Sequence, residues 1–240
     1  GYAVARLLAA EGWVVAVSAR DRADLEALAD DCADVPGDIR PFPLDVTDAS
    51  AAERVVADIE AELGDIALAI LNAGTHEPVD GRALSIAPFR RLMEINYMGT
   101  VNCLAPVVER CVACGSGRIA VVASLAGYRG LPTASAYGAS KAALINMCEA
   151  LRPELEEAGV TLSVVTPGFV RTPLTDKNPF PMPFLMDVEP AARRIVRGVA
   201  GQRFEITFPR RFAFLMKLFR IVPYRMFFAL TRRIRPVREG

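Results

Sequence analysis

Short apolar runs rich in β-branched residues alternate along the chain with longer amphipathic runs. Most of the short runs are apolar on both faces, which is typical of strands in a parallel sheet covered on both sides. We expect strands at residues 13–19, 38–46, 65–73, 117–124, 160–167 and 204–209. We expect helices at residues 22–33, 48–63, 88–113, 134–158 and 189–200. This alternation predicts a doubly wound α/β fold with a parallel sheet.

Chemically informative residues come at the ends of the expected strands. Arg20, Asp45, Asn72, Ser124 and Pro167 all stand at or just after such an end. Doubly wound sheets bind their ligands at the carboxyl ends of the strands. We therefore expect a ligand site along this edge of the sheet.

Composition and charge divide the chain into two parts. Its 240 residues are 52% hydrophobic, with 28 basic and 28 acidic side chains, which is enough for one full core. Residues 1–202 carry 18 Lys/Arg against 26 Asp/Glu, whereas residues 203–240 carry 10 against 2. We predict a single domain at 1–208 and a basic, apolar, helical extension at 209–240. We expect no nucleic-acid partner.

The cysteines indicate reduced thiols. They are odd in number and scattered, and no signal peptide precedes them, which favours a cytoplasmic location. Cys111 and Cys114 form a Cys-x-x-Cys pair, but a metal site usually needs about four ligands and no second cluster exists. We expect this pair to close a helix and expect no bound metal.

Tyr137 and Lys141 stand four residues apart in SAYGASKAAL (135–144), so a helix would place both on one face. Reducing a ketone with a hydride requires a proton donor at the carbonyl oxygen. A free tyrosine has a pKa of about 10, too high for efficient proton exchange near neutrality. A cation one turn away lowers such a pKa by about 1–3 units. The pair therefore predicts an acid/base tyrosine, and Ser124 can hold the oxygen by a hydrogen bond.

The spacing of these residues resembles that of the short-chain dehydrogenase/reductase family. Ser124 lies 13 residues before Tyr137, and Asn96 lies 28 residues before Ser124. LNAG (71–74) and PGFVRT (167–172) resemble two further family motifs. The resemblance covers about residues 1–208 and implies a Rossmann-like oxidoreductase.

The resemblance implies roles for particular residues. Lys141 would also bind the nicotinamide ribose, and Asn96 would help hold a water near Lys141 for proton relay. The catalytic set is then Asn96, Ser124, Tyr137 and Lys141. The implied cofactor residues are Gly1, Ser18, Arg20, Asp45, Val46, Asn72, Ala73, Gly74, Tyr137, Lys141, Pro167, Gly168, Val170 and Thr172. His76, the only histidine, receives no catalytic role.

Arg20 favours NADP(H) over NAD(H). In the family, an acid at the end of the second strand selects NAD through the ribose hydroxyls. Ala19 fills that position here and Arg20 follows it, with Ser18 close by. An arginine there can pair with the 2′-phosphate of NADP(H). The alternative is a solvated arginine that opens a helix.

The start of the chain differs from the family pattern. Gly1 aligns with the last glycine of the family's N-terminal GxxxGxG turn, which holds the pyrophosphate. We expect the preceding strand and two glycines to be missing. Residues 13–19 and 65–73 would then face each other across a gap with unpaired backbone groups. The sequence thus predicts a fragment that binds cofactor poorly and unfolds easily.

The segment 172–190 resembles the family's substrate lid and contains five prolines. Its large apolar residues favour a small lipophilic carbonyl or alcohol substrate, although a lid packed on the body would have the same composition. These residues are Phe180, Met182, Phe184, Leu185 and Met186.

Residues 209–236 mix large apolar residues with arginines and lysine. Their uncharged runs are far shorter than the about 20 residues of a spanning helix, and Pro223 should divide them into two short helices. One interpretation is peripheral contact with an anionic membrane. The other is packing on the same chain or on a second subunit.

Together these features predict an NADP(H)-dependent carbonyl reductase or alcohol dehydrogenase that forms a homo-oligomer. The alternative is a non-catalytic nucleotide-binding or regulatory protein on the same scaffold. The intact set of Asn96, Ser124, Tyr137 and Lys141 argues against that alternative, because a pure binder has no need of all four.

Overall fold

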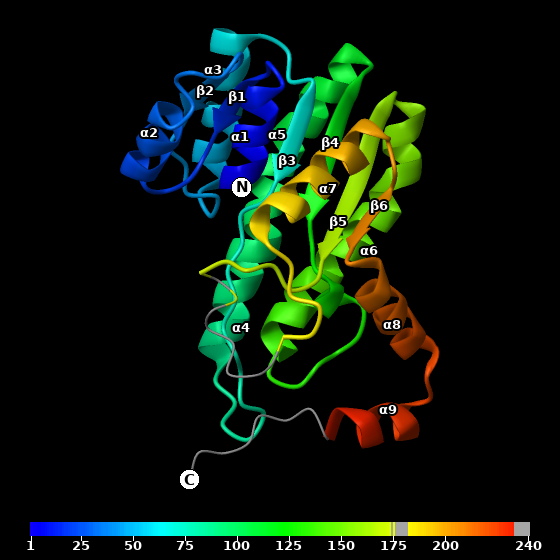
Figure 1. Cartoon of the computed structure of the whole chain (residues 1–240). Coiled ribbons are helices and arrows are strands. Elements are labelled where there is room, and N and C mark those ends of the chain that lie inside the picture. The colour runs from blue at the N-terminus through cyan, green and yellow to red at the C-terminus, as the bar shows by residue number, and fades with distance from the viewer. Residues whose placement is uncertain (174, 176–181, 233–240) are drawn as a thin grey trace.

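The structure is a computed structural model that describes residues 1–173, 175 and 182–232 (Figure 1). Its strands are β1 (Val14–Val17), β2 (Asp38–Pro41), β3 (Leu68–Leu71), β4 (Gly117–Val122), β5 (Val160–Pro167) and β6 (Glu205–Phe208). Its helices are α1 (Tyr2–Ala10), α2 (Arg22–Asp30), α3 (Ala49–Leu63), α4 (Ile86–Leu92), α5 (Gly99–Cys114), α6 (Ser135–Glu157), α7 (Val188–Ala200), α8 (Arg210–Ile221) and α9 (Tyr224–Thr231). Every expected strand is present and every expected helix has a counterpart, although the one at 88–113 is divided, which confirms the α/β fold.

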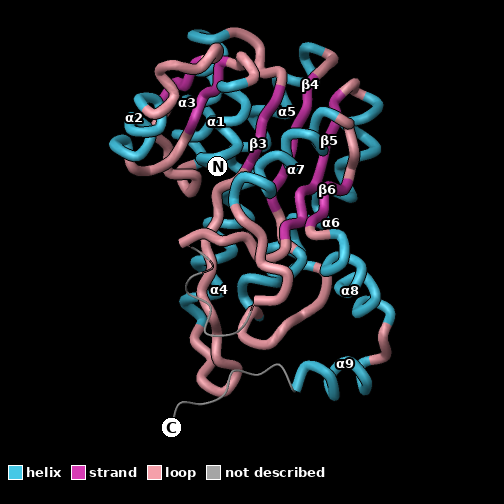
Figure 2. Tube along the Cα trace, in the orientation of Figure 1, coloured by secondary structure: helices cyan, strands magenta, loops and turns pink. Residues whose placement is uncertain are grey.

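All strand pairs are parallel, but the strands form two separate sheets. β1 pairs with β2, in register from Val14 opposite Asp38. The second sheet has the order β3-β4-β5-β6, with Leu68 opposite Arg118 where β3 meets β4. Figure 2 shows the strands of both sheets as magenta segments between cyan helices.

β1 and β3 lie on opposite sides of a cavity of about 1270 Å³. Residues of both strands line it, together with residues of α1. The backbone groups on the facing edges of β1 and β3 do not pair with each other, so no hydrogen-bonded ladder joins the two sheets. The expectation that a preceding strand belongs in this space stays a prediction.

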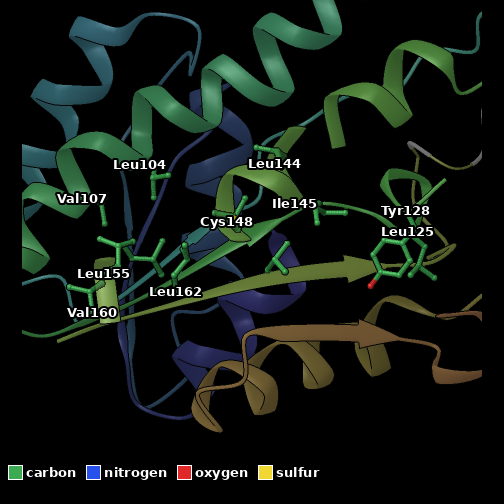
Figure 3. Close-up of a cluster of buried hydrophobic side chains, with 14 of the residues drawn as sticks. Leu104, Val107, Leu125, Tyr128, Leu144, Ile145, Cys148, Leu155, Val160 and Leu162 are labelled. Carbon is green, nitrogen blue, oxygen red and sulfur yellow. The ribbon is translucent and has the colours of Figure 1, made fainter. Parts of the chain in front are cut away.

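Helices cover both faces of the larger sheet. Alternate residues of one strand serve the two faces: Ile119 and Val121 of β4 enter the core shared with α5 and α6, whereas Ala120 enters the core shared with α1 and α7. Figure 3 shows the first core. Its labelled members are Leu104, Val107, Leu125, Tyr128, Leu144, Ile145, Cys148, Leu155, Val160 and Leu162. Burial on both faces explains why Ile119, Ala120 and Val121 form a continuous apolar run in β4.

The helix expected at 88–113 is interrupted. A π-helical turn, Met93–Met98, separates α4 from α5. Such turns are rare and occur frequently at functional sites. Here the turn contains Asn96, which is fully buried.

The C-terminal extension forms α8 and α9, separated at Pro223 as expected. Phe212 and Met216 of α8 are buried in the core that α6 and β5 also form. Phe227 of α9 is buried as well. Across the described residues, no helix is both long and apolar enough to cross a bilayer. One face of the extension is therefore part of the fold.

Candidate active site

Close contact between α6 and the turn after β4 brings Ser124 to Tyr137. Ser124 caps a short 3₁₀ turn, Leu125–Gly127, by accepting a hydrogen bond from the Ala126 N–H at 3.1 Å. A Cβ at Gly127 would lie 2.8 Å from the backbone of Lys141, and one at Gly138 would lie 3.0 Å from the Ala126 oxygen. Only glycines at these positions allow the helix to approach so closely.

The hydroxyl of Ser124 lies close enough to that of Tyr137 for a hydrogen bond to favour the phenolate. Burial raises the pKa of Tyr137, and this hydrogen bond lowers it by less. We expected a lowered pKa, so the direction in the structure is opposite. The reason is that removal of the phenolate from water outweighs the favourable contacts of the charged form.

Lys141 lies beneath Tyr137 and is 4% exposed. Its Nζ donates a hydrogen bond to the Val122 carbonyl at 2.8 Å and lies 5.9 Å from the centre of the Tyr137 ring. Burial lowers the pKa of Lys141 to about 8. A group with this pKa can exchange protons close to neutral pH.

Asn96 joins this cluster through the loop after β3. Its Oδ1 accepts a hydrogen bond from the Thr75 N–H at 2.7 Å, and its Nδ2 donates to the Thr75 carbonyl and to Ser140 Oγ, each at 3.0 Å. A Cβ at Gly74 would lie 3.3 Å from both Asn96 Oδ1 and Lys141 Nζ. The four predicted catalytic residues therefore lie together.

Two residues at this cluster were not selected from the sequence. Ser140 supports Asn96 and directly precedes Lys141. His76 lies edge-on to Tyr137, with ring centres 4.7 Å apart. Its position just after the NAG motif was the available signal, but no pattern in the sequence places it against Tyr137.

Apart from Tyr137 and Lys141, which belong to the catalytic cluster, the predicted cofactor residues divide into two groups. Eight line the large cavity between the sheets: Gly1, Ser18, Arg20, Asp45, Val46, Asn72, Ala73 and Gly74. The second group is the loop with Pro167, Gly168, Val170 and Thr172, which does not line the cavity in the described part of the chain. That loop follows β5, where the Gly168 N–H donates to the Phe208 carbonyl at 2.7 Å and Val170 bridges to Met186.

Glycines let the wall of this cavity pack closely. A Cβ at Gly99 would lie 2.6 Å from Val46, and one at Gly74 would lie 3.3 Å from Asn96 Oδ1. Asp45 stands on its rim and accepts hydrogen bonds from the Thr47 N–H at 3.0 Å and Thr47 Oγ1 at 2.8 Å. These bonds lower the pKa of Asp45, with a smaller contribution from Arg20.

The expected lid contacts the C-terminal extension. Phe184 stacks on Phe212 of α8 at 6.0 Å between ring centres, and Phe169 stacks on Phe212 at 5.6 Å. Met182, Leu185 and Met186 are half-buried. Phe180 lies outside the described residues. α8 therefore supports both the loop after β5 and the lid.

Comparisons with known proteins agree with this geometry. The sequence profile of the family described as short chain dehydrogenase matches residues 1–180. The chain is 34% identical over 235 residues to an uncharacterized oxidoreductase of Myxococcus xanthus, covering 98% of this chain and 93% of that protein. It is 30% identical over 179 residues to the 3-oxoacyl-acyl-carrier-protein reductase FabG of Thermotoga maritima, covering 75% and 73%. A short-chain type dehydrogenase/reductase structure from Mycobacterium marinum aligns at a TM-score of 0.78 and 26% identity, covering 86% and 88%.

Replacing Tyr137 with Phe removes one oxygen and should lower kcat by about 10²–10⁴-fold, the usual contribution of an acid/base group. Cofactor affinity should fall much less than kcat, because the aromatic ring is kept. Tyr128→Phe is a matched control, because the Tyr128 hydroxyl bonds Thr166 and Glu205 instead. Steady-state turnover and cofactor titration check the prediction. Near-full turnover of Tyr137→Phe would exclude the tyrosine as the proton donor.

Lys141 should make stability depend on pH. Between pH 8 and 10.5, the unfolded chain binds a proton that the folded chain has lost, so this group's contribution to stability rises with pH in that window. Lys141→Met removes the effect. Its free energy of unfolding relative to wild type should therefore fall by about 2–3 kcal/mol between about pH 7 and about pH 10. Urea unfolding at both pH values measures this, and a pH-independent difference would contradict the burial argument.

Proposed function

The chain belongs to the short-chain dehydrogenase/reductase family, and on that premise we propose that it reduces lipophilic ketones, or oxidises the matching secondary alcohols, with NADP(H). It is an oxidoreductase that acts on CH–OH or C=O groups with NAD(P). The observation that carries the catalytic part of this proposal is the cluster of half-buried Ser124 and Tyr137 with buried Lys141 and Asn96.

Each member of this cluster has a role in the reaction. A nicotinamide cofactor, when bound, would supply the hydride for the carbonyl carbon. The hydroxyls of Ser124 and Tyr137 are positioned together and donate hydrogen bonds to the carbonyl oxygen as negative charge develops on it. Tyr137 then gives its proton to that oxygen.

Lys141 restores the proton. Its ammonium lies near the ring of Tyr137 and stabilises the phenolate that forms. Because burial lowers its pKa to about 8, Lys141 can also release a proton near neutral pH. Asn96 holds the loop at Thr75 and Gly74 against Lys141. In this proposal it also helps to hold a water that relays protons to Lys141.

The geometry disfavours a purely binding role. Burying a lysine that is charged at neutral pH reduces stability, as the lowered pKa of Lys141 reflects. A protein that only binds nucleotide gains nothing from this cost. A catalyst gains an acid of suitable strength beside its tyrosine, which favours the enzymatic interpretation.

The preference for NADP(H) is supported by Arg20. This exposed arginine follows β1 and lines both the large cavity and an adjoining cavity of about 320 Å³. Its guanidinium suits a 2′-phosphate, which it can bind in a bidentate manner. Asp45 on the same rim carries a negative charge. It fits the adenine end of the cofactor, but less specifically than Arg20 fits the 2′-phosphate.

A lipophilic substrate is supported by the surroundings of the loop after β5. Phe169, Phe184 and Phe212 form an apolar stack beside it. The Thermotoga relative is named a 3-oxoacyl reductase, which indicates a ketone on an acyl chain for that protein. The expectation of a homo-oligomer stays a prediction.

Arg20→Ala should weaken NADPH binding by about 10–100-fold, the contribution of a charge-assisted hydrogen bond to a phosphate. NADH binding should change little, because NADH has no 2′-phosphate. The matched control is Arg22→Ala, since Arg22 pairs with Glu26 on α2 at 2.8 Å. Initial rates of ketone reduction at varied NADPH and NADH give both values. Equal losses for the two cofactors would show that Arg20 does not recognise the phosphate.

A further inference from the structure

The two C-terminal helices present one face to the body and another to solvent. Phe212, Ala213 and Met216 of α8 are buried in the core. Phe214 and Ile221 on the same helix are 72% and 77% exposed. Figure 1 shows both helices, in orange and red, projecting from the end of β6 away from the sheets.

The exposed face follows helical geometry. Phe214, Leu218 and Ile221 recur at intervals of four and three residues and form a stripe on α8 opposite the core-facing residues. On α9, Met226 and Leu230 are one turn apart and exposed. Further exposed apolar residues of the two helices are Leu215, Tyr224 and Phe228.

Basic residues accompany this apolar face. Residues 210–232 contain six Lys/Arg and no Asp/Glu. Arg210, Arg211, Lys217 and Arg225 are all exposed. The rest of the domain has the opposite balance, with 26 acidic against 18 basic residues at 1–202. The positive charge is therefore concentrated on the extension.

Body contacts fix the orientation of this face. The Arg129 guanidinium stacks over Tyr224 at 4.4 Å and Phe227 at 4.6 Å, and it donates hydrogen bonds to the carbonyls of Arg220 at 3.1 Å and Val222 at 3.4 Å. Lys217 pairs with Glu205 of β6. The exposed stripe is therefore held in place rather than left to a loose tail.

We propose that the outer face of α8 and α9, which consists of Phe214, Leu218, Ile221, Met226 and Leu230 with the neighbouring arginines, docks on an anionic lipid surface. Short helices that combine large apolar residues with basic residues bind at the boundary of headgroups and acyl chains. Each basic residue near an anionic leaflet adds attraction. A two-fold contact between two copies of this face would bring like charges together.

Docking would place the substrate end of the site at the lipid. α8 begins at the carboxyl end of β6, and its buried Phe212 stacks on Phe184 of the expected lid. The opposite side of the same helix carries the outer face. A lipophilic substrate could thus pass from the bilayer to the lid over one helix. The docking itself does not depend on the proposed oxidoreductase function.

The test is flotation of residues 1–240 with vesicles of phosphatidylcholine alone or with about a third phosphatidylglycerol. We expect flotation only with the anionic vesicles and release at high salt, because screening weakens the attraction. The double variant Phe214→Ser, Ile221→Ser should lose about tenfold in vesicle affinity or more. Val112→Ser is the control, since Val112 is an exposed apolar residue on the last turn of α5, which leads into the start of β4.

Failure of wild type to float with anionic vesicles would overturn the proposal. A second result would also overturn it: light scattering detects a wild-type dimer, the double variant is a monomer, and both bind vesicles equally. The face would then bind a second copy of the chain. Turnover of a water-soluble ketone is measured on the same samples. It tests the proposed oxidoreductase function independently of the proposed lipid docking. The double variant should retain it, since neither residue lies in the catalytic cluster.

Discussion

The hydrogen bond from Lys141 Nζ to the Val122 carbonyl ties α6 to the end of β4, and the geometry of the site depends on it. It holds a charged group in a nearly dry position, directly beneath Tyr137 and beside Gly74. The glycines at 127 and 138 make this approach sterically allowed. Asn96 then closes the cluster from the π-helical turn. A side chain at either glycine would meet the neighbouring backbone, so the position of the acid/base pair is set by packing.

The second organising element is α8, which packs one face into the core and exposes the opposite face to solvent. Its Phe212 lies between Phe169 of the loop after β5 and Phe184 of the lid region. Gly168 must be a glycine here, because a Cβ would lie 2.9 Å from the Phe212 ring. The extension is therefore packed against the loop after β5 and the expected lid. Its outer face remains available for the lipid contact that we propose.

Much of the fold could be predicted because strands buried on both faces leave a plain signal. The strand at 160–167 has the expected bounds, and the other five are shorter than expected because their flanking residues lie in loops. The π-helical turn could not be predicted, since one extra residue per turn leaves the apolar pattern of 88–113 almost unchanged. It is held by the hydrogen bonds of Asn96 to Thr75 and Ser140, which are contacts distant in sequence. The direction of the Tyr137 pKa shift was wrong for a related reason, because burial is a property of the tertiary structure.

The central claim is that this cluster directs a hydride to a carbonyl carbon while Tyr137 protonates the oxygen. The most direct measurement uses NADPH deuterated at the hydride-donating carbon, a long-chain ketone as substrate and mass spectrometry of the alcohol. The account predicts one deuterium per product molecule, bound to the carbinol carbon, in an amount equal to the NADPH oxidised. NADPH oxidation without deuterium in the alcohol, or no consumption of ketone by any nicotinamide cofactor, would contradict it.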